Sequence, residues 1–196
     1  MNKNKGFMPA IILAAICFVC AVLLSTTYVL TKSAVDKQEV DAANQRQKEI
    51  FSDGTDFTPL SLSSEEKNLL NESECMFDEA YSVTDTNGTL LGYIFIHSEF
   101  GYAGNVVTTT GISPSGEILM VIATAASDTP KLGKEVENRA FLDAFTGLSS
   151  QRDLVLNQDV DAVASATISS TAAVNSVNHS LEAYRLLFTE GGDSHE

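Results

Sequence analysis

Residues 81–97 read YSVTDTNGTLLGYIFIH and hold the strongest structural signal in the chain. Asn87-Gly88 is typical of a two-residue turn between antiparallel strands, because both residues tolerate the positive φ angles that such a turn needs. It separates the strand-like segments Tyr81–Thr84 and Thr89–His97, and the second of these is almost continuously apolar. The sequence therefore predicts a β-hairpin whose second strand is covered on both faces.

A second hairpin and several helices surround this one. Asn105–Ile112 and Glu117–Ala125 are strand-like and flank Ser113–Gly116, whose Pro and Gly suit a tight turn. Apolar residues recur at helical spacing over 134–145 and over Ile168–Phe188. We also expect a short helix over 63–71 and a short strand over 154–156. The predicted fold class is α+β, a twisted, mainly antiparallel sheet with flanking helices.

The N-terminal region has the pattern of a membrane anchor. Phe7–Leu30 is free of charged side chains and, at ~1.5 Å per residue, is long enough to cross a ~30 Å hydrocarbon layer. It is longer than the apolar core of a secretory signal and lacks a small-residue cleavage site, so we expect an uncleaved anchor, with a cleaved signal as the alternative. Lys3 and Lys5 favour a cytoplasmic N-terminus and a domain outside the membrane.

A polar, helix-favouring stretch follows the anchor. Ser33–Ile50 contains no Gly or Pro and carries a thin apolar stripe, and Ser52–Thr55 ends it. We therefore expect three parts: a cytoplasmic tip and transmembrane anchor helix over 1–32, a stalk helix over 33–54, and an extracytoplasmic domain over 55–196.

The charge of the chain is unevenly distributed. Residues 1–32 contain three lysines and no acidic residue, so the formal net charge of −14 leaves −17 on residues 33–196. An acidic body lacks the basic surface that nucleic-acid binding needs, which excludes that class of function. Cys17 and Cys20 lie inside the apolar span and Cys75 is alone, so the domain is expected to have no internal disulfide.

Three segments place turn-forming or small residues where predicted strands and helices meet: Gly101–Gly104, Ser127–Gly133 and Asp161–Ser170. The third opens the last helix with an excess of hydroxyl side chains, namely Ser165, Thr167, Ser169, Ser170 and Thr171. One hydroxyl is enough to cap a helix, and capping is the plain interpretation. The alternative is an anion site, because the free N–H groups and the helix dipole suit a phosphate.

The third segment resembles the flavinylation motif of FMN-binding domains, whose pattern is roughly Asp-x-x-Ser/Thr-Gly-Ala-Thr. Asp161-Ala-Val-Ala-Ser-Ala-Thr167 matches it at Asp161, Ala166 and Thr167, with Ala164 in place of Ser/Thr and Ser165 in place of Gly. The resemblance implies that Thr167 carries FMN through a phosphoester. It also implies that Asp161 is the acid that the flavin transferase recognises.

The other two segments resemble the same family in the same order. Gly101-Tyr-Ala-Gly104 is similar to its Gly-Tyr-Gly-Gly segment, and Asp128-Thr-Pro-Lys-Leu-Gly133 to its Glu-Thr-Pro-Gly-Leu-Gly segment. Glycines lack a Cβ and permit a flat ring to approach the backbone. The cofactor-binding residues that the resemblance implies, beside Thr167, are Ser165, Ala166, Gly101, Tyr102, Gly104, Thr129, Leu132 and Gly133.

FMN-binding domains of this kind occur in the G subunit of the Rnf ferredoxin:NAD oxidoreductase, which this chain resembles in size and anchor. The resemblance implies a relay of single electrons between redox centres of neighbouring membrane subunits, coupled to Na⁺ or H⁺ transport. The alternatives are an anchored non-redox domain that binds a ligand or organises partners, and a free-standing extracytoplasmic flavoprotein. No metal site is expected, because His97, His179 and His195 show no ligand spacing.

Overall fold

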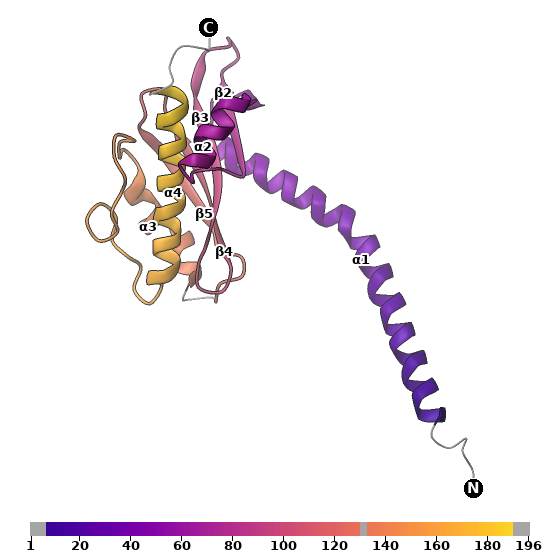
Figure 1. Ribbon diagram of the computed structural model, residues 1–196. Coiled ribbons are helices and arrows are strands. Elements are labelled where there is room, and N and C mark those ends of the chain that lie inside the picture. The colour runs from indigo at the N-terminus through magenta and orange to yellow at the C-terminus, as the bar shows by residue number, and fades with distance from the viewer. Residues whose placement is uncertain (1–6, 130–132, 190–196) are drawn as a thin grey trace. The chain divides into compact units, whose positions relative to one another are not determined.

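The computed structural model describes residues 7–129 and 133–189 (Figure 1). The chain divides into two compact units, Met1–Gln45 and Arg46–Glu196. Most of helix α1 (Phe7–Ile50) makes up the described part of the first unit. Within it, Pro9–Lys32 has a mean hydropathy of 2.6 and no buried residue, which fits the length and composition of a membrane span or a signal sequence.

The second unit is built on a sheet that contains five strands within the described residues, in the order β1-β2-β3-β4-β5. The strands are β1 (Asp56–Pro59), β2 (Glu79–Thr84), β3 (Leu90–Phe100), β4 (Asn105–Ile112) and β5 (Ile118–Thr124). Each pairs antiparallel with its neighbour in the sequence, so the sheet is a meander and both predicted hairpins are confirmed. The sequence does not predict strand β1, because this short edge strand has almost no buried side chain and so shows no alternation of apolar and polar residues.

Helix α2 (Ser64–Glu72) begins where the sequence predicts a short helix. Ser63 accepts a hydrogen bond from the backbone N–H of Glu66 at 3.2 Å, and the Glu66 carboxylate accepts one from the N–H of Ser63 at 2.7 Å. This reciprocal pair is a capping box, and it satisfies two N–H groups that the helix itself leaves unpaired.

The segment 134–145, predicted as one helix, is divided into three short pieces: η2 (Gly133–Glu137), α3 (Arg139–Leu142) and η3 (Asp143–Phe145). The break follows from Asn138, whose side chain accepts from the N–H of Ala140 and starts a new helix. The strand predicted over 154–156 is also wrong, since the described structure has only a single bridge there, between Leu156 and Val160.

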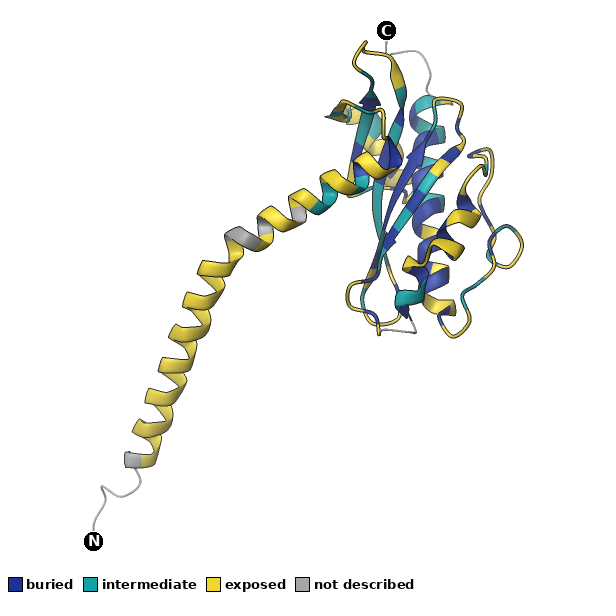
Figure 2. Cartoon of the chain, turned by 180° about the vertical axis from the view of Figure 1, so that it is seen from behind, coloured by how far each residue is buried: buried dark blue, intermediate teal, exposed yellow. Residues whose placement is uncertain are grey.

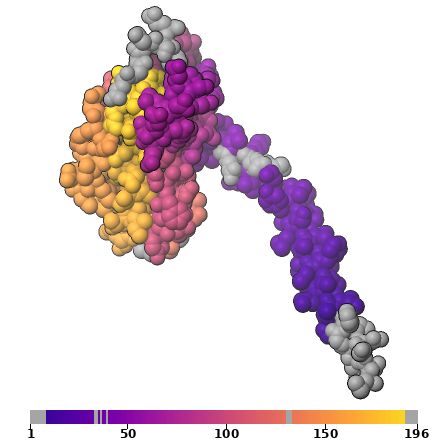
Figure 3. Space-filling model, in the orientation of Figure 1, coloured from indigo at the N-terminus to yellow at the C-terminus, as the bar shows by residue number. Residues whose placement is uncertain are grey.

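Helix α4 (Thr167–Phe188) lies along one face of the sheet, against β3 and β4 (Figures 1 and 2). Its buried face, which includes Val177 and Leu181, joins Phe95 of β3 in the larger hydrophobic core. On the surface, α4 is the yellow band between the orange chain that precedes it and purple α2 (Figure 3). Cys75 lies in this core, and burial raises the pKa of its thiol to about 11, so it stays protonated at neutral pH.

The opposite face of the sheet is covered at one place by the end of α1. Ile50 and Phe51 form a second core with Val83 and Ile94. Two glycines make this contact possible: a Cβ at Gly111 would lie 2.1 Å from Ile50 Cγ2, and one at Gly92 would lie 2.8 Å from Phe51 Cζ. The last turn of α1 therefore packs as part of the second unit.

Candidate functional site

The three segments singled out in the sequence meet at the carboxylate of Asp128. One oxygen of Asp128 accepts a hydrogen bond from the backbone N–H of Ala103 at 2.8 Å, and the other accepts from the hydroxyl of Ser169 at 2.5 Å. The Ser169 oxygen in turn accepts from the N–H of Tyr102 at 3.4 Å. The β3–β4 turn, the segment after β5 and the first turn of α4 are thus held together by one buried acid.

Asp128 was matched to the family pattern in the sequence, but its role as the link between segments was not predicted. Its side chain is almost fully buried, at 4% exposure, and Ser169 is completely buried. A buried carboxylate is tolerated only when hydrogen bonds replace its lost water, and the two donors described above do this. The sequence signal for this role is an acidic residue between a predicted strand and a predicted helix. That position alone does not identify the groups that donate hydrogen bonds to its carboxylate.

The glycines of the motifs have close neighbours inside the protein. A Cβ at Gly133 would lie 2.1 Å from Asp128 Oδ2, and one at Gly104 would lie 2.6 Å from Ser127 Cβ. At Gly101 the nearest atom would be Val106 Cγ2, at 2.8 Å. These positions therefore require glycine in order to build the turn and seat Asp128, a reason independent of any bound ring.

Some of the hydroxyl groups at the start of α4 make hydrogen bonds within the protein, and others do not. Ser169 binds Asp128, Ser170 accepts from the N–H of Val163 at 3.1 Å, and Thr171 donates to the carbonyl of Thr167 at 2.9 Å. Thr167 is exposed, and its hydroxyl has no hydrogen-bond partner within residues 7–129 and 133–189. Thr167 and Ser165 therefore have hydroxyls without a partner in the described structure, and of these two Thr167 is the one in the first turn of α4.

The N-terminus of α4 lacks a side-chain cap in the described structure. Its N-cap residue is Ala166, which has no hydrogen-bonding side chain, so the first N–H groups of the helix keep their capacity for an anion. Ser165, just before it, has a φ of 65°. That left-handed conformation explains the Gly of the family pattern at this position, and serine adopts it here at a cost of roughly 1 kcal/mol.

The remaining predicted residues differ in their exposure to solvent. Tyr102 and Thr129 are exposed, and Ala166, the neighbour of Thr167 in the sequence, is buried. Asp161 is exposed, and its carboxylate has no interaction partner among the described residues. Leu132 lies outside the described residues. The structure thus brings the backbone of Gly101–Gly104, Asp128 and the start of α4 together, and leaves Asp161 facing solvent.

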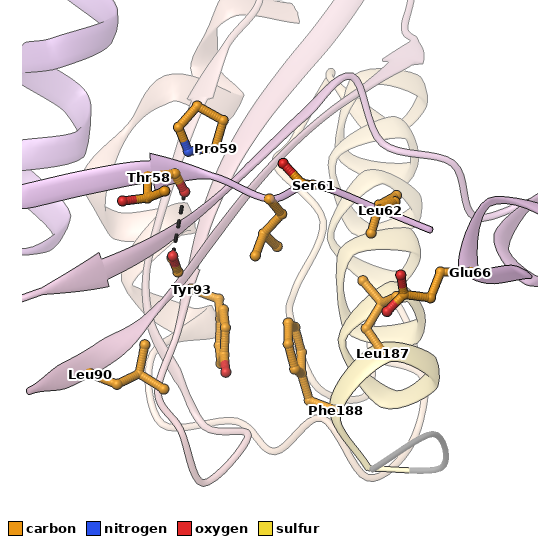
Figure 4. Close-up of a pocket in the computed structure, with 11 residues that line it drawn as sticks. Thr58, Pro59, Ser61, Leu62, Glu66, Leu90, Tyr93, Leu187 and Phe188 are labelled. Atoms are coloured by element: carbon orange, nitrogen blue, oxygen red, sulfur yellow. Dashed lines mark hydrogen bonds between the residues drawn. The ribbon is translucent and has the colours of Figure 1, made fainter. Parts of the chain in front are cut away.

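A separate cavity of about 410 Å³ lies at the other end of α4 (Figure 4). Its wall is mainly apolar, and Tyr93 stacks on Phe188 with ring centroids 3.9 Å apart. Phe188 ends α4 and Thr167 begins it, so at ~1.5 Å per residue the cavity is roughly 30 Å along the helix from Thr167. The cavity is therefore distinct from the site of the three motifs.

Comparison with known proteins agrees with the motif resemblance. Residues 101–182, which include all three segments, match the FMN-binding domain family. The chain is 30% identical over 184 residues to the G subunit of the ion-translocating oxidoreductase complex of Pasteurella multocida, covering 87% of this chain and 89% of that one. It is 28% identical over 193 residues to the G subunit of the Na⁺-translocating ferredoxin:NAD⁺ oxidoreductase complex of Acetobacterium woodii, covering 92% of each chain.

Among solved structures, the C subunit of the Na⁺-translocating NADH-quinone reductase from Parabacteroides distasonis is similar to this chain with a TM-score of 0.49 and 14% identity. The similarity covers 66% of this chain and 77% of that one.

Proposed function

This chain belongs to the family of G subunits of Rnf-type ion-translocating oxidoreductase complexes, and from that membership we propose that it carries one FMN covalently on Thr167 and relays electrons within such a complex. The other subunits of the complex are its partners in this proposal, and the apolar part of α1 is its membrane anchor. It has no complete active site of its own and acts as an electron-transfer subunit.

The observation that carries the proposal is the free hydroxyl of Thr167 at an uncapped helix N-terminus. A phosphate ester there places its charged oxygens beside the N–H groups at the positive end of the helix dipole. The residues present therefore fit the phosphate end of FMN. A protein that only organised partner subunits would have no need of this arrangement.

Attachment requires one bond to form at Thr167 Oγ1. The hydroxyl loses its proton and bonds to the phosphorus of FMN, supplied by a flavin donor that holds FMN through a phosphoanhydride; the other half of that anhydride leaves with the bonding electron pair. We assign the catalysis of this transfer to a separate flavin transferase. The residues of the site would hold FMN, which would supply the one-electron chemistry that side chains lack.

The residues around the Asp128 link would hold the flavin ring in this proposal. Tyr102 and Thr129 are exposed next to the Asp128 link and offer an aromatic face and a hydroxyl to it. Gly101 and Gly104 shape the β3–β4 turn, and Gly133 lies against the Asp128 carboxylate. Ser165 and Ala166 position Thr167 at the phosphate end, and Leu132 completes the predicted set.

An intact mass of the full chain extracted from membranes tests the central proposal. Co-expression with a flavin transferase is expected to add the mass of one FMN, less one water, to each chain. The same protein expressed without the transferase is the control and is expected to show the unmodified mass. An unmodified mass in both preparations would leave the non-redox scaffold as the better hypothesis.

Asp161→Ala is expected to reduce flavin loading while leaving the domain folded. The carboxylate has no partner within the described residues, so its removal costs little stability, yet it is exposed for an external enzyme to recognise. Loading is measured by in-gel flavin fluorescence and folding by circular dichroism. Asp143→Ala removes an exposed acid outside the motif and is the matched control. Loading of Asp161→Ala at the wild-type rate would contradict the assignment.

The domain is expected to lie outside the cytoplasmic membrane. Lys3 and Lys5 precede the apolar segment, and positive residues favour the cytoplasmic side. Protease added to cells with a permeable outer layer is expected to digest the domain while a cytoplasmic marker protein stays intact. Protection of the domain until the inner membrane is lysed would reverse the orientation.

A further inference from the structure

Two histidines that are distant in the sequence share one carboxylate between β3 and α4. The Glu99 oxygen Oε1 lies 3.6 Å from His97 Nε2 and 3.3 Å from His179 Nε2. The two imidazole rings are 4.7 Å apart, centroid to centroid. His97 and Glu99 are alternate residues of β3 and so lie on the same face of the sheet, beneath the α4 residue His179.

We propose that His97, Glu99 and His179 form a binding site for one divalent transition-metal ion such as Zn²⁺. The proposal is independent of the function argued above. In a tetrahedral zinc site with bonds of about 2.0–2.2 Å, neighbouring ligand atoms are about 3.4 Å apart. The two nitrogen–oxygen distances already match that separation, and the ligand atoms of all three residues lie within 4.8 Å of one another.

The two rings have no hydrogen bond on the side that faces away from Glu99. The Nδ1 atoms of His97 and His179 are both buried without a hydrogen-bond partner in the part of the chain that the structure describes. Buried polar side-chain atoms in proteins are nearly always paired. Within the described residues neither ring is fixed by a hydrogen bond at Nδ1, and the Nε2 atoms of both rings face the Glu99 carboxylate.

Charge and access both suit a cation. Glu99 faces the pair directly, and the carboxylate of Asp78, just before β2, also acts on His97 electrostatically. One carboxylate thus faces both imidazoles and a second acts on His97, in a protein of net charge −14. Side-chain exposures of 12% for His97, 28% for His179 and 32% for Glu99 leave an opening to solvent for an ion and for water as its fourth ligand.

The site is separate from the attachment residue. His179 follows Thr167 by twelve residues on α4, which at ~1.5 Å per residue is about 18 Å along the helix. An ion there clamps the middle of α4 to β3 and does not touch the proposed FMN phosphate. The expected effect is therefore on the stability of the helix–sheet contact, and flavin loading is not required to observe it.

The test uses the full chain in detergent, without FMN, after removal of metal by a chelator. Titration with Zn²⁺ in a calorimeter is expected to give one site per chain and a raised melting temperature, because an ion that binds only the folded state stabilises it. His179→Gln and Glu99→Gln are each expected to weaken binding at least about tenfold, since the loss of an outer-shell partner alone costs that much.

His195→Gln is the matched control, because it removes the third histidine of the chain and is expected to leave Zn²⁺ binding unchanged. Circular dichroism of each variant shows whether it is folded. Substitution by Co²⁺ gives a second measurement on the wild-type chain, whose visible absorption is expected to have the bands of a tetrahedral nitrogen and oxygen site. Absence of Zn²⁺ binding by the wild type, or binding by both ligand variants equal to that of the wild type, would overturn the proposal.

Discussion

Thr167→Ala is expected to remove covalent flavin entirely and to leave a chain that folds as the wild type does. The hydroxyl is the only group lost that takes part in the proposed ester, and it has no hydrogen-bond partner in the described structure, so its loss leaves no buried group unpaired. The measurement is ultraviolet fluorescence of the denatured band together with the intact mass. Wild-type fluorescence and mass in the variant would place the ester on another residue.

Thr171→Ala is the matched control for this experiment. Thr171 lies one turn further along α4, is also exposed, and uses its hydroxyl only to bind the carbonyl of Thr167. Its alanine variant is expected to carry one FMN per chain. The pair therefore separates the chemistry of one hydroxyl from a general disturbance of the first turn of the helix.

Asp128→Ala is expected to lower the free energy of unfolding of the domain by about 2–4 kcal/mol. The substitution leaves the hydroxyl of the completely buried Ser169 without its acceptor, which costs ~1–3 kcal/mol, and the loss of the part-buried bond from the Ala103 N–H adds a smaller amount. For a domain of this size the melting temperature falls by roughly 5–12 °C. Thermal unfolding followed by circular dichroism measures the change.

Two further variants serve as comparisons for the melting temperature of Asp128→Ala. Asp143→Ala removes an exposed carboxylate whose ion pair with Arg139 spans 3.8 Å, and it is expected to change the melting temperature little. Asp128→Asn keeps an oxygen that can accept from Ala103 and is expected to be intermediate. A melting temperature of Asp128→Ala equal to that of the wild type would show that the three segments are held together by other contacts.

Local signals account for most of what the sequence predicts correctly. Asn87-Gly88 and Ser113–Gly116 specify their hairpins through turn chemistry, and Ser63 starts α2 through a capping box with the nearby Glu66. The last helix follows from the periodicity of its apolar residues. In each case the residues that determine the element lie within it or beside it.

Tertiary contacts account for most of what the sequence does not predict. Gly133 was predicted to make room for a ring, whereas its close neighbour in the structure is Asp128. The partners of Asp128 and the pairing of His97 with His179 join distant parts of the chain, and no spacing along the sequence indicates them. Asn138 is the local exception, because its own side chain caps a new turn and so interrupts a good helical pattern.

The order of the meander has a consequence for biosynthesis. Because every strand pairs with the strand before it, the sheet assembles progressively as the polypeptide is made. Helix α4 is the final element, and Asp128 lacks its Ser169 donor until that helix docks. A nascent chain that has not yet made α4 therefore lacks this link between the three segments. On the proposal of covalent FMN, we expect modification to follow completion of the whole polypeptide and chains cut short within α4 to remain unmodified.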